Sequence, residues 1–428
     1  MNKYKLKDCI ELVIDYRGKT PKKLGGDWVE KGKRVISALN VHNGVIDNED
    51  KIRCVSNEIY SKWMKIEIQR NDCLIASEGA SLGENAIWDS DEKIVLGQRL
   101  YAIRTNNNVL DPWYLAMYMQ TDKFRQQVNQ ISTGSTVLGI SQPNLLSLEL
   151  LLPDIETQRK VGKLYKCIFR KITINEKINK ELEAILKDIY NYWFLQFEFP
   201  NEEGKPYKSS GGNMIWNEKL KMEIPKGWDV EKLEKNINLI NGISYTTENI
   251  KNYVGTPMIN LSSIDIKKNY KANEIKFFEG SYNTEKEVFC GDMLIACTDL
   301  TRNADIIGSP ILVPDEYEKY LYTMDLVKLE VVNGKINPLY LYAALRTDFY
   351  CEYIKKYASG TNVLHLNTDG IKEFKMIIPT RGIQDKFARI IEIYHNKKCN
   401  LIRENKVLIS LKEFILPLLS SGQIEIRK

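Results

Sequence analysis

A chain of 428 residues is too long for one ordinary domain core, and a hydrophobic content of 43% excludes a disordered chain. The net charge of +5 permits a polyanionic partner without requiring one. Eight cysteines without a Cys-x-x-Cys pair predict free thiols in a reducing cytoplasm rather than a metal site or a disulfide framework.

The N-terminal residues carry charges every few positions and lack the apolar segment of a signal peptide. No apolar run approaches the ~20 residues that a membrane span needs. We therefore expect a cytoplasmic protein without a membrane segment.

Residues 1–152 predict a first β-rich domain, in which short apolar runs such as residues 73–76 alternate with polar loops. Asp111 stands at the expected N-cap of a helix, with Pro112 at the first helical position. The segment from Asp111 to Tyr114 also resembles the Asp-Pro-Pro-Tyr motif of adenine methyltransferases. Its second proline is missing, as is a glycine-rich loop for S-adenosylmethionine. We therefore interpret the motif as a helix cap.

Residues 153–198 predict a long central helix, because apolar residues recur at steps of three and four. The phase of this stripe shifts near Asn175, which indicates a stutter or a local polar layer. Residues 199–217 are rich in Gly, Ser, Pro and charge and predict a linker. A second β-rich domain over residues 218–378 and a distal long helix over residues 379–428 follow. The side chains predicted to pair the helices are Val161, Leu164, Ile168, Ile172, Leu182, Ile185, Ile189, Phe387, Ile391, Tyr394, Leu401, Leu408, Leu411 and Ile415.

The second half of the chain repeats the first. Four landmarks recur 226 residues later, which chance rarely produces. The pairs are Asp111 with Asn337, Gly134 with Gly360, Pro153 with Pro379, and Gln158 with Gln384. The helical portions keep this register, whereas the β-rich portions differ by insertions. The sequence therefore predicts two similar units that do related but non-identical work.

No catalytic constellation is visible in the sequence. The three histidines, His42, His365 and His395, form no His-x-x-x-His or Ser-His-Asp spacing, and there is no P-loop. We therefore expect no active site, no metal site and no cofactor on this chain.

The duplicated order of motifs resembles the specificity subunit of type I restriction–modification systems. The motifs are the loop Gly18-Lys19-Thr20-Pro21, a glycine turn with serine or threonine in each half, the start Pro225-Lys226-Gly227-Trp228, and Pro-x-x-x-x-Gln before each long helix. The resemblance covers essentially the whole chain. It implies an α+β fold, in which two target recognition domains are joined by two long antiparallel helices with pseudo-twofold symmetry.

The resemblance also implies a function. Each half is expected to read one half of a bipartite site on double-stranded DNA, while the helical pair sets the spacing. Two methyltransferase subunits are expected to dock on the chain, with or without restriction (translocase) subunits. Those partners, and not this chain, would bind S-adenosylmethionine, and ATP with Mg²⁺ where restriction is present. The chain itself would not be an enzyme.

Two other functions fit the residues. One is a coiled-coil scaffold that binds proteins and no DNA, and the other is a self-sufficient methyltransferase. Steeply salt-dependent retention on duplex DNA distinguishes a DNA reader from the scaffold. Binding of S-adenosylmethionine by the isolated chain would indicate the methyltransferase.

Contacts to DNA are expected from the polar loops, with lysine and arginine on phosphates and amide or hydroxyl side chains on base edges. The phosphate candidates are Arg17, Lys19, Lys22, Lys23, Arg99, Lys267, Lys268 and Arg302. The base-edge candidates are Thr20, Asn40, Asn43, Ser77, Asn85, Ser244, Asn260, Thr298 and Asn303. Beside the two glycine turns, hydroxyl and amide groups can reach phosphate, or the turn can instead dock the domain on its helix. These turn residues are Thr133, Ser135, Thr136, Thr361 and Asn362.

Overall fold

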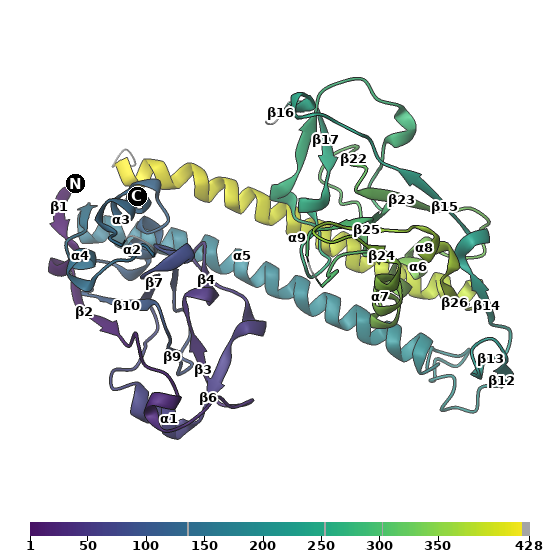
Figure 1. The fold of residues 1–428 in the computed structure, drawn as a ribbon, viewed down its shortest axis with the longest axis horizontal. Helices are drawn as coiled ribbons and strands as arrows, with labels where there is room; N and C mark the ends of the chain where they lie inside the picture. Colours follow the sequence, from purple (N-terminus) through teal and green to yellow (C-terminus); the bar gives the residue numbers. More distant parts are fainter. Residues whose placement is uncertain (135–136, 252–253, 302, 422–428) are drawn as a thin grey trace. The chain divides into compact units, whose positions relative to one another are not determined.

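The computed structural model describes residues 1–134, 137–251, 254–301 and 303–421 (Figure 1). The chain divides into two compact units, Met1–Thr173 with Leu408–Lys428, and Ile174–Val407. Each unit combines one β-rich portion with a section of each long helix, α5 (Ile155–Tyr190) and α9 (Arg381–Ser421). This division passes through both helices, so the predicted domain boundaries remain a prediction.

The first unit is built on an antiparallel sheet of four strands in the order β2-β10-β7-β8. Its central strands are almost fully buried, as their continuous apolar runs predict. The strands of this unit are β1 (Asn2–Lys5), β2 (Ile10–Asp15), β3 (Lys33–Ile36), β4 (Val41–His42), β5 (Val45–Ile46), β6 (Arg53–Val55), β7 (Cys73–Ala76), β8 (Asn85–Ile87), β9 (Val95–Leu96), β10 (Leu100–Thr105) and β11 (Glu149–Leu152). Its helices before α5 are α1 (Asn57–Trp63), α2 (Pro112–Tyr118), α3 (Asp122–Ile131) and α4 (Gln142–Leu146).

The second unit repeats this plan with the strand order β15-β23-β19-β21. Its strands are β12 (Met214–Asn217), β13 (Met222–Pro225), β14 (Asp229–Lys232), β15 (Ile237–Asn241), β16 (Ile250–Lys251), β17 (Thr256–Ile259), β18 (Lys276–Phe278), β19 (Met293–Ala296), β20 (Thr298–Asp299), β21 (Pro310–Leu312), β22 (Leu321–Tyr322), β23 (Leu326–Val331), β24 (Ala358–Ser359), β25 (Leu364–Leu366) and β26 (Lys375–Ile378). Its short helices are α6 (Pro338–Ala344), α7 (Asp348–Ile354) and α8 (Asp369–Glu373).

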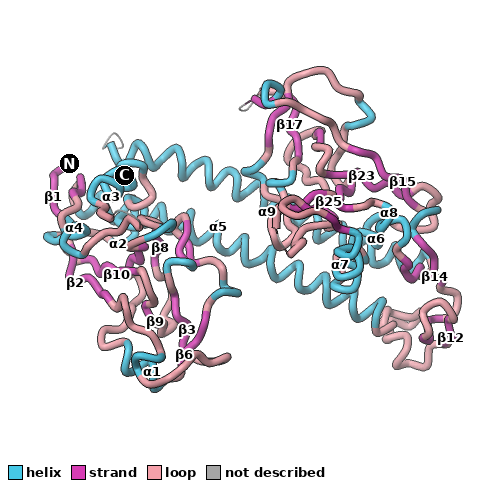
Figure 2. Tube along the Cα trace, in the orientation of Figure 1, coloured by secondary structure: helices cyan, strands magenta, loops and turns pink. Residues whose placement is uncertain are grey.

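Smaller sheets also recur in the two units, whose strands are coloured magenta in Figure 2. Strand β1 pairs with β11 as β14 pairs with β26. Strand β3 lies antiparallel to β6 and parallel to β9, and β17 makes the same two pairings with β18 and β22. The internal repeat predicted from the sequence is therefore a repeat of topology.

The segment predicted as a linker, residues 199–217, folds against the second unit. Phe199 is buried, and its ring stacks on Tyr207 at 4.5 Å and on Trp228 at 4.9 Å between centroids. Strand β12, at the end of the segment, pairs with β13. The linker prediction relied on the Gly, Ser and charged residues and overlooked these aromatic side chains, which attach the segment to the core.

The buried face of α5 follows alternating steps of four and three residues, the spacing of a heptad seam. The seam comprises Val161, Tyr165, Ile168, Ile172, Asn175, Asn179, Leu182 and Leu186. Two residues predicted for pairing, Leu164 and Ile185, lie beside this seam and are 41% and 52% exposed. The helix needs no stutter near Asn175, because the seam passes through a polar layer there.

The seam of α9 has the same spacing, and its positions stand 226 residues after those of α5. They are Phe387, Ile391, Tyr394, Lys398, Leu401, Asn405, Leu408 and Lys412. Leu411, another predicted pairing residue, is 40% exposed for the same reason as Leu164. Sorting by apolar character alone missed the polar members of both seams.

In the second unit the two helices run antiparallel. The Asn175 side chain donates to Glu404 and to Asn405, each at 2.8 Å. Further along α5, the Glu183 carboxylate accepts from Lys398 at 2.6 Å, at a position earlier in α9. Residue numbers therefore increase along α5 in the direction in which they decrease along α9, as expected for antiparallel helices.

Candidate nucleic-acid interface

A short hairpin stands at the end of the central sheet in each unit, where the two glycine turns were predicted. In the first unit, Thr133 and Gly139 exchange backbone hydrogen bonds of 2.9 Å, and Ile140 N donates to Ser77 O at 2.7 Å. In the second unit, β24 and β25 form the same pairing, and Leu366 N donates to Cys297 O at 2.8 Å. Each hairpin is thereby docked on the loop that follows the buried strand β7 or β19.

The glycine of each hairpin is required by its backbone. Gly134 has φ +131° and Gly360 has φ +133°, a conformation that L side chains rarely adopt. An added Cβ would collide with the carbonyl oxygen of Val137 or Val363, respectively. The turn is thus built in the same way twice.

The first hairpin lies beside a cluster of charged side chains. Arg99, which has a positive φ of 62°, pairs with Glu78 at 3.2 Å, and both are substantially exposed. Arg17 donates to both oxygens of Asp15 and lies over the Tyr101 ring, 4.1 Å from its centroid. The hydrogen bond with Asp15 raises the pKa of the Arg17 guanidinium. This end of the sheet therefore presents permanently charged donors to solvent.

The second unit keeps the frame and changes the side chains. Cys297 N donates to Asp325 O at 2.7 Å, as Ser77 N donates to Arg99 O at 2.8 Å. Asp325 therefore stands where the first unit has Arg99. By the matching strand registers, Thr298 replaces Glu78 and Ile243 replaces Arg17. Leu300 and Met324 are also exposed here. The two ends have the same architecture and different chemistry.

A buried glutamine at the start of each long helix fastens it to its β-rich portion. Gln158 accepts from Asp111 N at 3.1 Å and donates to Val109 O and Pro153 O. Gln384 makes the corresponding three hydrogen bonds in the second unit. These bonds give a physical role to the recurring Pro-x-x-x-x-Gln motif.

The Asp-Pro and Asn-Pro segments are helix caps, as predicted. The Asp111 carboxylate accepts from Trp113 N at 3.0 Å and Tyr114 N at 2.9 Å, and Asn337 accepts from Leu339 N at 2.9 Å. Burial raises the pKa of Asp111, although these backbone bonds oppose the rise.

Several predicted DNA-contacting residues are exposed or half-buried at the surface of their unit. Arg17, Arg99 and Thr133 lie together near the first hairpin, and Thr361 and Asn362 belong to the second. The structure also leaves Thr20, Lys22, Lys23, Asn43, Ser244, Lys267 and Asn303 exposed or partly exposed in loops.

Other candidates are buried, which corrects their assignment as base readers. Asn40 donates to the backbone of Asp47 and Asn48, and Asn85 donates to Gly83 O and Met119 O. Asn260 caps a turn and donates to Glu274 O. Ser77 and Thr298 are buried in the hairpin docking loops. The amide side chains of Asn40, Asn85 and Asn260 serve the fold, since buried polar groups need partners. The Ser77 hydroxyl is buried with no hydrogen-bond partner among the described residues.

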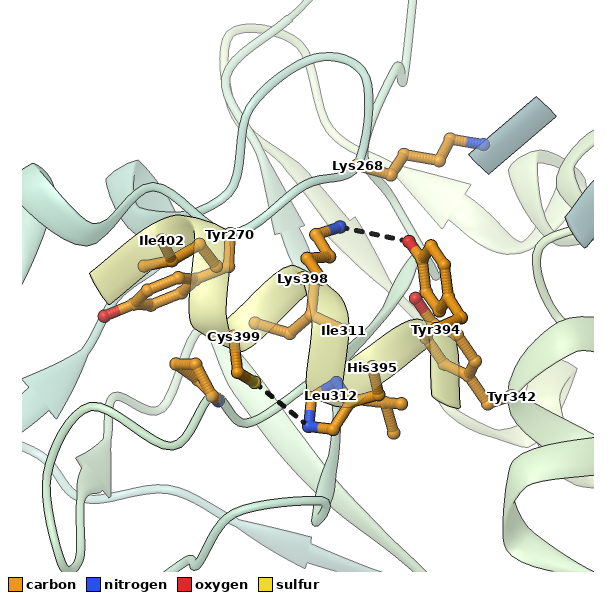
Figure 3. A pocket seen from close by; sticks show the side chains of 11 residues that line it. Lys268, Tyr270, Ile311, Leu312, Tyr342, Tyr394, His395, Lys398, Cys399 and Ile402 are labelled. Atoms are coloured by element: carbon orange, nitrogen blue, oxygen red, sulfur yellow. Dashed lines mark hydrogen bonds between the residues drawn. The ribbon is translucent and has the colours of Figure 1, made fainter. Parts of the chain in front are cut away.

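Two lysine candidates are also engaged internally. Lys19 donates to Trp63 O at 2.9 Å, and desolvation lowers its pKa. Lys268 donates to Cys351 at 2.6 Å and lines a small cavity beside α9 (Figure 3). Both are poorly placed for phosphate contact. Ser135, Thr136 and Arg302 lie outside the described residues.

Sequence reasoning missed some residues at these ends. Glu78, Tyr101 and Asp325 became visible only when strand registers aligned the two units. It also missed a group with metal-ligand spacing, Cys290 with His395 and Cys399, which the fold assembles within the described residues. Burial lowers the pKa of His395, which favours the neutral form of its ring.

Comparisons with known proteins agree with the resemblance seen in the sequence. A family model described as the type I restriction modification DNA specificity domain matches residues 1–184 and 225–411. The type I restriction enzyme HindI specificity subunit of Haemophilus influenzae is 21% identical over 416 residues, which cover 84% of this chain and 88% of the relative. The MjaIX specificity subunit of Methanocaldococcus jannaschii is 23% identical, over 74% of this chain and 69% of its own.

A solved structure has the same fold. The S subunit of a type I restriction–modification system from M. genitalium superposes with a TM-score of 0.60 and 15% identity, over 97% of this chain and 94% of the other. In the part of the chain that the structure describes, no helix is both long and apolar enough to cross a membrane.

Proposed function

The chain belongs to the family of type I restriction modification DNA specificity domains, and on that premise we propose that each of its two units reads one half of a bipartite DNA site. The chain is a specificity subunit and not an enzyme, so methylation or cleavage depends on partner subunits. We assign the reading surface of each unit to the end of the central sheet that carries the hairpin.

The observation that carries this proposal is the change of side chains on a repeated frame. Arg99 of the first unit and Asp325 of the second occupy the same backbone position. Arginine is suited to the acceptor edge of guanine, whereas aspartate accepts from the amino group of cytosine. Two surfaces of one architecture and opposite hydrogen-bonding character fit two different half-sites.

The polar loop that follows β2 supplies the contact to phosphate. Lys22 and Lys23 are exposed, and Lys23 donates to Gly18 O at 2.8 Å, which keeps the loop compact. Lysines of this kind position a protein on the duplex without selecting a sequence. The exposed Lys267 is our candidate for the same role in the second unit.

The long helices supply the distance between the two readers. Both carry heptad seams in one register, and the second unit shows them pairing antiparallel. An internal repeat of this kind offers two equivalent docking faces, so we propose two methyltransferase subunits as partners. S-adenosylmethionine, and ATP with Mg²⁺ where restriction subunits join, would be bound there. The cysteines of the described residues are free thiols, which fits a cytoplasmic complex.

The test is Arg99→Ala in the full chain co-expressed with its methyltransferase subunit. Loss of one bidentate base contact should weaken DNA binding by about 1–3 kcal/mol and relax the methylated motif at one base. Arg159→Ala is the matched control, since Arg159 donates to Asn107 O beyond the opposite end of β10. Equal effects of both substitutions, or an unchanged methylated motif with Arg99→Ala, would show that the hairpin end is not part of the reading surface.

A further inference from the structure

Two cysteines and one histidine from distant parts of the sequence meet in the second unit. Cys290 lies shortly before β19, and His395 and Cys399 lie one turn apart on α9. The Sγ atoms of Cys290 and Cys399 are 3.7 and 3.6 Å from His395 Nε2. All three atoms lie within 4.8 Å of one another. Figure 3 shows His395 and Cys399 on the same turn, joined by a dashed line.

The two sulfur-to-nitrogen separations match an edge of a zinc coordination tetrahedron. Zinc binds thiolate at ~2.3 Å and imidazole at ~2.0–2.1 Å, so tetrahedral angles place sulfur and nitrogen roughly 3.6 Å apart. The side chains already stand at that spacing in the protein alone. Two thiolates and an imidazole are also ligand types that suit zinc, whereas magnesium and calcium prefer oxygen ligands.

The surroundings supply the outer contacts that a metal site uses. The backbone of Val313 lies near the His395 ring and that of Asp315 near Cys399, close enough to influence the pKa of each. Such contacts orient the imidazole and stabilise thiolate in metal sites. The Asp315 carboxylate, about half exposed, pairs with Arg403 at 3.3 Å, and its charge acts on both His395 and Cys399.

We propose that Cys290, His395 and Cys399 bind one zinc ion, with water or Asp315 at the fourth position. The ion would fasten α9 to the segment that enters β19. Because β19 leads directly to the loop that docks the second hairpin, the metal would fix the second reading surface on its helix. This role concerns the construction of the second unit and does not depend on which bases it reads.

The first unit provides an internal comparison. Matching α5 to α9 and β7 to β19 places Phe169, Thr173 and Arg70 where the second unit has His395, Cys399 and Cys290. Phenylalanine, threonine and arginine side chains are not among the ligands that bind zinc in proteins. The Phe169 ring instead packs on Trp113, with 5.4 Å between centroids. The first unit thus uses an aromatic contact at the level where the second gathers metal ligands.

The full chain should be purified under reducing conditions and its zinc content measured by plasma mass spectrometry. One zinc per chain is expected to survive dialysis, and cobalt exchanged into the site should give the visible bands of a tetrahedral thiolate complex. Cys399→Ser and Cys290→Ser should each lose both signals. Cys167→Ser, which removes an exposed thiol of α5, is the matched control and should keep them.

His395→Phe copies the residue of the first unit and therefore serves as a variant expected to fold. Added zinc should raise the melting temperature of the metal-stripped parent chain and leave that of His395→Phe unchanged. Absence of bound zinc and of the cobalt spectrum in the reduced parent chain would overturn the proposal. A disulfide between Cys290 and Cys399 in that preparation would also overturn it, and would make the cluster a redox pair.

Discussion

Replacing Gln384 by leucine should destabilise the second unit strongly, although the side-chain volume hardly changes. Gln384 is fully buried, accepts from Asn337 N at 2.8 Å, and donates to Lys335 O at 3.1 Å and Pro379 O at 2.7 Å. Leucine offers none of these bonds. Three backbone groups without a partner, at roughly 1 kcal/mol each, sum to about 3 kcal/mol.

The assay is thermal and urea unfolding of the full chain, followed by tryptophan fluorescence and circular dichroism. About 3 kcal/mol corresponds to a fall of roughly 6–12 °C in melting temperature for a unit of this size. Gln158→Leu should show a loss of similar size in the first unit, because its hydrogen bonds are the same. Gln126→Leu, on an exposed face of α3, is the control. A Gln384→Leu variant as stable as this control would refute the role given to the glutamine.

Gln384→Glu separates the hydrogen bonds from the packing. A glutamate buried at this site should have a pKa above its unfolded value of ~4.3. The protonated carboxyl can still donate one bond, so this variant should be most stable at low pH and lose stability as the pH rises through the raised pKa. A variant equally stable at pH 5 and pH 8 would contradict this.

Three further outcomes are expected. Gly360→Ala should strain the second hairpin by about 1–3 kcal/mol and lower the affinity for one half-site. Gly382→Ala, whose added Cβ meets open space, should leave this affinity unchanged. Titrations with duplexes altered in one half-site measure the two affinities. Replacing Lys22 and Lys23 by alanine should weaken binding alike on all sequences and reduce the slope of log K against log salt by about 1.8, and a change of motif would contradict it. Desolvation raises the pKa of Glu183, but the neighbouring cations Lys398 and Arg346 outweigh it, so the net pKa is lowered. The stabilising contribution of Glu183 should therefore be lost as the pH falls through this lowered pKa. Glu183→Gln should make the stability of the chain less dependent on pH on the acid side of its unfolding profile.

The duplication and the two long helices were predictable because their signals are local or periodic. Caps at Asp111 and Asn337 depend on residues next to them, and the seams depend on a repeat within one helix. The seam phase was predicted less well. Tyr165 is buried where Leu164 was expected, since a heptad position is defined by geometry and accepts polar or aromatic side chains.

The candidate site was harder to predict, because burial of a polar side chain is decided by the whole fold. Asn40 and Asn260 look like base readers in the sequence, but each helps to form a capping box inside its unit. The exposed pair of Arg99 and Glu78 depends on strands that meet only after folding. The approach of Cys290 to His395 joins positions 105 residues apart, which no local spacing reveals.

The most direct test of the account exchanges one reader and sequences the methylated DNA. Residues 218–376 would be replaced by the matching part of a relative with a different target, with the long helices and the first unit unchanged. With a functional methyltransferase partner, one half of the methylated motif should change to that of the donor while the other half and the spacer stay the same. Change in both halves, or in neither, would contradict two independent readers on a repeated frame.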